Sequence, residues 1–575
     1  MIRLLRYLRP YRFLILVVFV LVAAQSLANL YLPNLMADIV NDGILKNDQG
    51  YILRVGGLML LVSLGGTLCA VGSAFFAARV AVGFGRDVRG RLFGHVERFS
   101  LHEFDTVGTA SLITRTTNDT NQVQQLLVLS LTVMVSAPFT AVGGIILAVQ
   151  QDAALTWVLA VAVPVLVIAL ALIMTRAVPL FQLMQKKIDK INLILDETLT
   201  GVRVIRAFDR DRYEARRFDV ANLDLTDTAI RVNRLIAILF PFMMLVLNAT
   251  TVAIFWFGSV RVADQQMSFG ALIAFLQYGL LILFAFLMIS VMFIFLPRAA
   301  ASATRINEVL DIAPEITDPA RPRDAVGQRG VVEFRDVTFS YPGAEEPALS
   351  HLSFTARPGR VTAVIGGTGA GKSTLANLIP RFYDADSGSV LVDGVDVREQ
   401  SQEALRAKIG YVPQRAVLFS GTIAENIRHG KQAATDEEVR RAAETAQAAE
   451  FIDAMPDGYG ATLAQGGTNV SGGQKQRLAI TRALVRRPEI YVFDDTFSAL
   501  DYATDARLRR ALRHETTDAT VLIVAQRVST IMNADQILVL DEGRLVGSGT
   551  HRELMATNDV YREIVLSQLS EEEVA

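Results

Sequence analysis

At 575 residues this chain is long enough for several domains, and its 51% hydrophobic content and mean hydropathy of +0.34 are high for a water-soluble protein. The formal net charge of −2 provides no overall basic surface, which argues against nucleic acid as a partner. The single cysteine, Cys69, excludes an internal disulfide and a cysteine-based metal site.

The apolar residues are concentrated before about residue 300. They form six runs, each long enough to cross a bilayer core of about 30 Å as a helix of about 20 residues. An even number of spans puts both ends of this part on one side of the membrane. The runs cover about 13–34, 55–80, 129–151, 153–178, 235–260 and 268–297.

Basic residues predict which side that is. Four arginines precede the first run, and the loops after the second and fourth runs are rich in Lys and Arg, which is typical of cytoplasmic segments. A cleaved signal peptide would also fit residues 3–24, but its removal would leave five spans. We therefore expect a multi-pass protein with both termini in the cytoplasm. The arginines are Arg3, Arg6, Arg9 and Arg12.

Two long polar stretches separate the apolar runs, from Arg86 to Val128 and from Gln182 to Arg234. Their length and helical periodicity predict that the spanning helices continue beyond the membrane. Turn-like interruptions at Phe104–Gly108 and at Thr200–Gly201 suggest a short crossing helix at each tip. Each tip is either a docking surface for a cytoplasmic domain, which we favour, or a solvated helical hairpin.

The pattern of the chain changes after the sixth run. We place a helical membrane domain at 1–310 and a linker rich in proline at 311–328. An α/β domain follows at 329–575, where short β-branched strands alternate with helices. The acidic end, Glu571–Glu573, is expected to be disordered.

A glycine-rich loop follows the predicted strand Val361–Ile365 and opens a helix. Glycines let the backbone N–H groups surround phosphates, and the helix N-terminus adds partial positive charge. Lys372 is placed to reach the β- and γ-phosphates, and the Ser373 hydroxyl to bind Mg²⁺. The predicted nucleotide-binding residues are Gly366, Gly367, Thr368, Gly369, Ala370, Gly371, Lys372, Ser373 and Thr374.

Two later segments specify the kind of phosphate loop. Residues 470–474, VSGGQ, precede a helix, with Ser471 as a candidate N-cap, and an apolar strand then ends at Asp494 and Asp495. In this order and spacing they resemble the signature and magnesium segments of ATP-binding-cassette (ABC) proteins. Six spans followed by one such cassette resemble an exporter-type half-transporter over nearly the whole chain.

The resemblance implies roles for further residues and a need for ATP and Mg²⁺. Tyr341 would stack on adenine, which we favour over the alternative of a core tyrosine at a strand end. Gln414 would contact Mg²⁺ and the attacking water, and Asp494 would complete the metal site with Ser373. Asp501 would communicate between two cassettes. The segments Ser100–Leu112 and Gly201–Arg212 would be coupling helices.

Three positions depart from the family pattern. Asp495 stands where the catalytic base is usually glutamate, and Asp is one methylene shorter. A misplacement of about 1 Å can cost about 100-fold in rate. Gln526 replaces a histidine that contacts the γ-phosphate, and glutamine can carry neither a proton nor a charge at that point. Gln465 replaces a glutamate in a segment just before the signature.

These departures bear on the oligomer. In this family two cassettes hold two ATP molecules, each between the phosphate loop of one chain and the signature of the other. Here the phosphate-loop side is altered, while the signature residues Ser471, Gly472, Gly473 and Gln474 match the pattern. The resemblance therefore implies the degenerate-site subunit of a bacterial heterodimer, similar to actinobacterial examples. A slow homodimer and a nucleotide-gated regulatory protein are the alternatives. The six spans exclude a soluble DNA-repair type of ABC ATPase.

The cargo is less well defined. No charged pair marks an ionic substrate within the spans, which favours a hydrophobic or amphiphilic substrate such as a drug, lipid, fatty acid or siderophore. Related folds move substrates in both directions, so the fold does not define the direction. Polar residues within the spans either face a pathway or join helices. They are Gln25, Asn29, Asn34, Asn248, Gln277 and Tyr278.

Overall fold

The computed structural model describes residues 2–323 and 329–568. Its packing divides the chain into two compact units, which we describe separately. The first unit comprises residues 1–97 and 109–312, and the second comprises 98–108 and 313–575. Two predicted segments lie outside the described residues: the end of the linker at 324–328 and the disordered residues Glu571–Glu573. The predicted domain bounds stay predictions.

Among the residues that the structure describes, the first unit contains six helices that are long and apolar enough to cross a membrane, which confirms the six predicted runs. Four of these helices extend well past their apolar runs, because the two polar stretches between the runs are also largely helical. The long helices are α2 (Arg12–Asp38), α3 (Gln49–Val96), α6 (Thr120–Gln151), α7 (Trp157–Thr200), α9 (Asp211–Ala263) and α10 (Phe269–Asp311). Shorter helical segments are α1 (Ile2–Leu5), η1 (Arg6–Tyr11), η2 (Ile39–Ile44), α5 (Thr109–Thr114), η3 (Arg115–Asp119) and α8 (Val202–Ala207).

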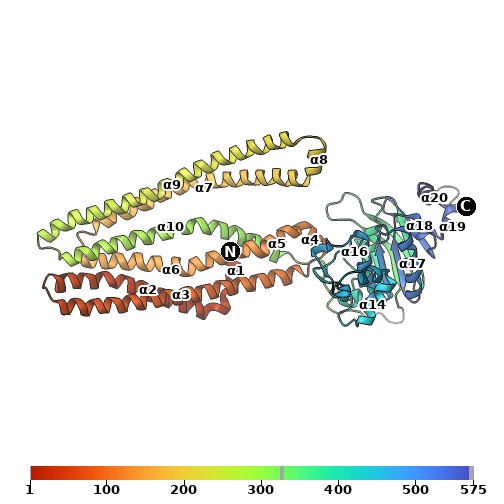
Figure 1. Ribbon diagram of the computed structural model, residues 1–575, viewed down its shortest axis with the longest axis horizontal. Coiled ribbons are helices and arrows are strands. Elements are labelled where there is room, and N and C mark those ends of the chain that lie inside the picture. Colours follow the sequence, from red (N-terminus) through yellow and green to blue (C-terminus); the bar gives the residue numbers. More distant parts are fainter. Residues whose placement is uncertain (1, 324–328, 569–575) are drawn as a thin grey trace. The chain divides into compact units, whose positions relative to one another are not determined.

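Within this unit, α2 packs against α3, α6 against α10, and α7 against α9 (Figure 1). Helix α8 joins the ends of α7 and α9, where Gly201 ends α7 as its C-cap, and no residue of α8 is buried. The predicted crossing segment 201–212 thus contains one helical turn and a half, held by backbone bonds rather than by a core.

Polar side chains in the spans join helices in this unit. The Asn34 amide oxygen lies 2.9 Å from the hydroxyl of Tyr278 and 2.6 Å from Nε2 of Gln151, so one amide connects α2, α10 and α6. Tyr278 is fully buried and also bonds to the Leu30 carbonyl. For Asn34 and Tyr278 the structure therefore shows the role of joining helices.

The second unit is built on a six-stranded sheet in the order β12-β11-β3-β10-β9-β6, with only β12 antiparallel. Successive strand residues are buried alternately in two cores, because side chains alternate across a sheet. The strands are β3 (Val361–Gly366), β6 (Ile409–Val412), β9 (Ile490–Asp494), β10 (Thr520–Val524), β11 (Gln536–Asp541) and β12 (Arg544–Gly549).

A four-stranded antiparallel sheet, in the order β2-β1-β4-β5, contributes to one of these cores. Its strands are β1 (Val332–Phe339), β2 (Leu349–Ala356), β4 (Ser387–Val392) and β5 (Val395–Asp396). The pair β7 (Gly421–Thr422) and β8 (Thr462–Leu463) forms a small separate sheet. The helices are α4 (Leu101–Val107), α11 (Lys372–Leu378), α12 (Gln402–Ala407), α13 (Ile423–Arg428), α14 (Asp436–Thr445), α15 (Ala449–Asp453), α16 (Gly472–Arg486), α17 (Tyr502–Glu515), α18 (Val528–Ile531), α19 (His551–Thr557) and α20 (Asp559–Leu566). This arrangement confirms the predicted α/β domain.

The first predicted tip helix belongs to the second unit. A capping box between Ser100 and Glu103 starts α4 at Leu101, so the interruption expected at 104–108 is confined to Gly108, whose φ is +78°. Buried Glu103 also accepts a hydrogen bond from the Glu315 N–H at 2.8 Å. One carboxylate therefore ties α4 to the start of the linker peptide.

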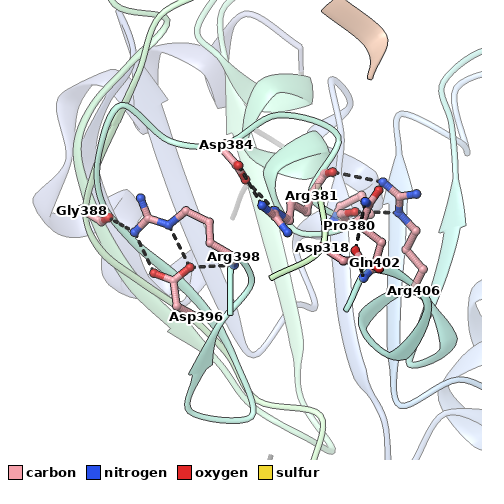
Figure 2. Close-up of polar contacts among 9 residues, drawn as sticks. All are labelled: Asp318, Pro380, Arg381, Asp384, Gly388, Asp396, Arg398, Gln402 and Arg406. Carbon is pink, nitrogen blue, oxygen red and sulfur yellow. Dashed lines mark hydrogen bonds and ion pairs between the residues drawn. The ribbon is translucent and has the colours of Figure 1, made fainter. Parts of the chain in front are cut away.

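The linker peptide continues along the second unit. Asp318 Oδ1 accepts hydrogen bonds from both the backbone N–H and the side-chain amide of Gln402, at 3.0 and 3.1 Å (Figure 2). Further on, Arg323 bonds through its backbone to the carbonyl of Glu399 and through its guanidinium to the carboxylate of the same residue. Residues 313–323 are thus attached to the cassette at several points, which limits their freedom as a linker.

Candidate nucleotide-binding site

The predicted site residues meet because of strand order. Strands β3, β10, β9 and β6 are neighbours and parallel, so the segments that follow them emerge at the same edge of the sheet. These segments carry the glycine-rich loop, Gln526, the Asp494–Asp495 pair and Gln414 respectively. The carboxyl edge of a parallel sheet is where ligands bind in open α/β folds.

The glycine-rich loop is held by its own lysine. Lys372 Nζ donates to the carbonyls of Gly366 and Gly367, at 2.9 and 2.7 Å. Gly371 has φ +89°, and a Cβ there would lie 2.5 Å from the Ala348 carbonyl oxygen, so only glycine fits. Burial lowers the pKa of Lys372, against the opposing charges of Asp495 and Asp494. A bound phosphate would compensate this buried cation.

Ser373 and Asp494 form the candidate magnesium ligands. The Ser373 hydroxyl donates to Asp494 Oδ1 at 3.0 Å. Burial raises the pKa of Asp494, and the nearby charge of Asp495 adds to this, against the hydrogen bond from Ser373 and the charge of Lys372. A buried carboxylate beside a hydroxyl and a second carboxylate is the hard oxygen environment that suits a divalent cation. These residues fit Mg²⁺.

The side chain of Asp495 is bound by two glutamines. Its Oδ2 accepts from Gln414 Nε2 at 3.1 Å and from Gln526 Nε2 at 3.0 Å. The residue is buried, has φ +44°, and its N–H bonds to the Val524 carbonyl, so its backbone is fixed as well. Gln414 and Gln526 therefore both contact Asp495, and one carboxylate oxygen accepts from two donors.

The aromatic residue predicted to stack on adenine lies beside the loop. The Tyr341 hydroxyl is 3.1 Å from the Thr374 hydroxyl, and the Tyr341 ring packs edge-on against Phe339 and Tyr383. Tyr383 also bonds to Asp105 of α4, and its burial together with that carboxylate raises its pKa to about 12. Sequence reasoning missed Tyr383, because no motif marks it and only the fold brings α4 to this ring.

The signature residues form a capped helix start elsewhere on the unit. Ser471 is the N-cap of α16 as predicted, in a capping box with Gln474, and Gly473 lies in the first turn. A Cβ on Gly472 would meet no atom within 4 Å, so this turn is open. Asp501 caps α17 by accepting from the Thr504 N–H, and this bond lowers its pKa.

Comparisons with known proteins agree with this arrangement. The ABC transporter transmembrane region family matches residues 15–287, and the ABC transporter family matches residues 349–498. An uncharacterized ABC transporter ATP-binding protein of Mycobacterium tuberculosis (strain CDC 1551 / Oshkosh) is 47% identical over 567 residues, which cover 98% of this chain and 97% of that protein. The chain belongs to the ABC transporters.

Two further comparisons refine the placement. A fatty acid ABC transporter ATP-binding/permease protein of Mycobacterium bovis (strain ATCC BAA-935 / AF2122/97) is 34% identical over 470 residues, covering 82% of this chain and 74% of that protein. A bacterial Atm1-family ABC exporter with ATP bound has a TM-score of 0.81 at 27% identity and covers 99% of both chains. This ABC transporter chain is thus an ATP-driven, multi-pass membrane translocase with an exporter fold.

Proposed function

We propose that this chain is one subunit of a heterodimeric transporter in a bacterial cytoplasmic membrane. It retains ATP at its own phosphate loop, while its signature completes the active site of a second half-transporter. Both termini lie in the cytoplasm, since the cassette needs cytoplasmic ATP and the basic loops favour that side.

The observation that carries this proposal is that two glutamine amides hydrogen-bond to the same oxygen, Oδ2, of Asp495. A general base must accept a hydrogen bond from the attacking water. Here Oδ2 of Asp495 already accepts from Gln414 and Gln526, and the Asp495 side chain is one methylene shorter than that of glutamate. Gln526 supplies a neutral amide where a titratable imidazole would assist the γ-phosphate. The site keeps the groups that bind nucleotide and departs from the family at the two positions of the base and the histidine.

The remaining groups support ATP retention. Lys372 and the loop N–H groups would bind the phosphates, Tyr341 would stack on adenine, and Ser373, Asp494 and Gln414 would hold Mg²⁺. The ion would supply charge neutralisation at the phosphates. Because Ser471 and Gly472 are on an open helix start, they can face the nucleotide of a partner. Asp501, one residue before α17, would lie at the contact between cassettes.

We also propose that the substrate is hydrophobic or amphiphilic. Among the described residues of the six apolar runs no acidic side chain pairs with a basic one, and the Arg261–Asp152 ion pair lies just outside the runs. A relative is named for fatty acids. The segments 100–112 and 201–212, at the tips of the helical extensions, would transmit cassette closure to the spans. Membrane lipid would surround the spans.

The decisive experiment compares the two sides of this chain in the purified complex with its partner. Ser471→Ala should lower total ATPase activity by about 10- to 100-fold, because it removes a donor at the competent site. Asp495→Asn should change it less than about threefold. Equal losses for both variants would instead indicate a symmetric homodimer, and continued substrate flux in Ser471→Ala would contradict the assignment of the signature.

Thermal unfolding of both variants provides the control. Ser471 is also a helix cap, and its loss costs about 1 kcal/mol of stability. Ser471→Thr preserves a capping hydroxyl and should unfold like the unmodified chain. An ATPase loss that follows only the unfolding temperature would count against the proposal. A complex that binds ATP and shows no turnover with any partner would favour the regulatory alternative.

A further inference from the structure

The loop that carries Gln526 is held from outside by the C-terminal segment. This loop, residues 525–528, links β10 to α18. Arg527 is extended within it, with φ −93° and ψ 125°, and provides no side-chain cap for α18. Val528, the first residue of α18, is fully buried, and its N–H is one of the donors that a helix start leaves without a partner in the helix.

Gln568 supplies that partner. Its Oε1 accepts from the Val528 N–H at 2.9 Å, and its Nε2 donates to the Gln526 carbonyl at 2.8 Å. A single side-chain amide therefore pairs with the peptide groups on both sides of Arg527, as a neighbouring strand would. Of the side chains with this reach, only glutamine offers a donor and an acceptor together.

The position of Gln568 is fixed by a packed helix. Helix α20 begins at the cap Asn558 and buries Tyr561 and Val565 completely in the core that also contains Val528. The Gln568 N–H then bonds to the Val565 carbonyl, which turns the chain toward the 525–528 loop. The amide thus belongs to an anchored element, although its own side chain is exposed.

The other side of the loop is attached to β3 and to the segment that follows β9. Arg527 donates to the Ser498 carbonyl at 3.0 Å, and the Ala525 N–H donates to the Val364 carbonyl of β3. Gln568 adds hydrogen bonds on the remaining side, so the backbone around residue 526 is held at both ends of the loop. From that position the Gln526 amide reaches Asp495.

We propose that Gln568 is a positioning residue for the nucleotide site, which acts by holding Gln526 against Asp495. We call the two hydrogen bonds from the Gln568 amide to the Val528 N–H and the Gln526 carbonyl the clamp. Loss of the clamp would let the 525–528 loop move and would speed release of the nucleotide that this site retains. The effect on retention rests on the proposed function. The clamp itself does not, since it concerns only backbone order in this loop.

The first arm of the test measures the clamp in the full-length chain in lipid nanodiscs by hydrogen exchange. Gln568→Ala should speed exchange at Val528 by about fivefold or more, corresponding to one lost hydrogen bond. Gln568→Glu keeps the acceptor and should keep Val528 protected. Ser567→Ala and removal of residues 569–575, which leaves Gln568 in place, are the matched controls and should match the unmodified chain. Unchanged exchange in Gln568→Ala would overturn the proposal.

The second arm tests whether Gln568 acts through Gln526, using release of radiolabelled ATP from the complex with its partner. Gln568→Ala and Gln568→Glu should each speed release by about 3- to 10-fold. In a Gln526→Ala background, Gln568→Ala should add no further change. An equal effect in both backgrounds would mean a general structural role and would overturn the proposal.

The two arms separate the clamp from the proposed function. If this site hydrolyses its ATP rapidly, the retention hypothesis fails. The effect of Gln568→Ala on kcat and KM is then compared between the unmodified chain and the Gln526→Ala background. A clamp acting through Gln526 should change kcat with KM within about twofold, and only while Gln526 is present. A change in KM alone would overturn it.

Discussion

The phosphate-loop side and the signature side of this cassette use their polar groups differently. On the first, Asp495, Gln414 and Gln526 satisfy one another. On the second, Ser471 and Gln474 satisfy the helix start, and Gly472 leaves open space above it. This difference is the one that the proposed function uses: the first side would hold its own nucleotide, and the second would complete the site of a partner.

The largest effect should come from rebuilding the altered side. Asp495→Glu combined with Gln526→His restores the longer carboxylate and a titratable imidazole. Hydrolysis at this chain's own site should then rise by about 10- to 100-fold. Vanadate trapping of labelled nucleotide, followed by separation of the two subunits, would measure it.

Single substitutions are the controls for that rebuilding, and each should raise hydrolysis less than the pair. ATP that remains bound without a gain in turnover would place the defect outside this chain, in the signature facing the site. The contrast between the two sides would then no longer depend on Asp495.

An intermediate effect is expected at the base-binding end of the same site. Tyr341→Ala should weaken ATP binding by about tenfold, since stacking on an aromatic ring is worth about 1–3 kcal/mol per base. Tyr341→Phe keeps the ring and loses the contact with Thr374, so binding should weaken by less than about fivefold. Equilibrium binding of ATP and of inorganic triphosphate would test this. Triphosphate binding should not change in either variant.

The smallest effect concerns α4 and the linker. Burial opposes ionisation of Glu103, but hydrogen bonds from Ser100 and from the Glu315 N–H outweigh it and hold the pKa of Glu103 below its ordinary 4.5. Its contribution to stability is therefore present above pH 4.5 and is lost as the pH falls through the lowered folded value. Glu103→Ala should cost about 1–2 kcal/mol locally, measured by hydrogen exchange of residues 98–108 and 313–318.

The matched variant for this effect is Glu103→Gln, which keeps an acceptor and cannot ionise. Its exchange in this segment should no longer change with pH across that range, while the unmodified chain loses protection. The same pH dependence in both proteins would assign the effect to another group. Neither variant should change ATP affinity, since Glu103 hydrogen-bonds to Ser100 and to the Glu315 N–H, and neither residue is a predicted nucleotide-binding residue.

Much of the fold and the candidate site could be predicted from local patterns. The six spans follow from run length, because a bilayer fixes the length of apolar helix it requires. The strand, glycine-rich loop and helix around Lys372 follow from backbone requirements within a few residues, and Ser471 as a cap follows from its own side chain. Asp495 and Gln526 could be recognised as departures by their place in motifs.

Contacts between distant segments required the tertiary structure. Strand order brings Gln414, Asp495 and Gln526 to one point, although more than 80 residues separate the first two. Asp105 hydrogen-bonds to Tyr383, and Gln568 hydrogen-bonds to the Gln526 carbonyl, although no periodicity or motif in the sequence predicts either contact. The sequence by itself determined the chemistry available to this protein, since that depends on residue types and local spacing. Only tertiary packing decided which groups satisfy each other, because a hydrogen bond depends on distance in space and not on distance along the chain.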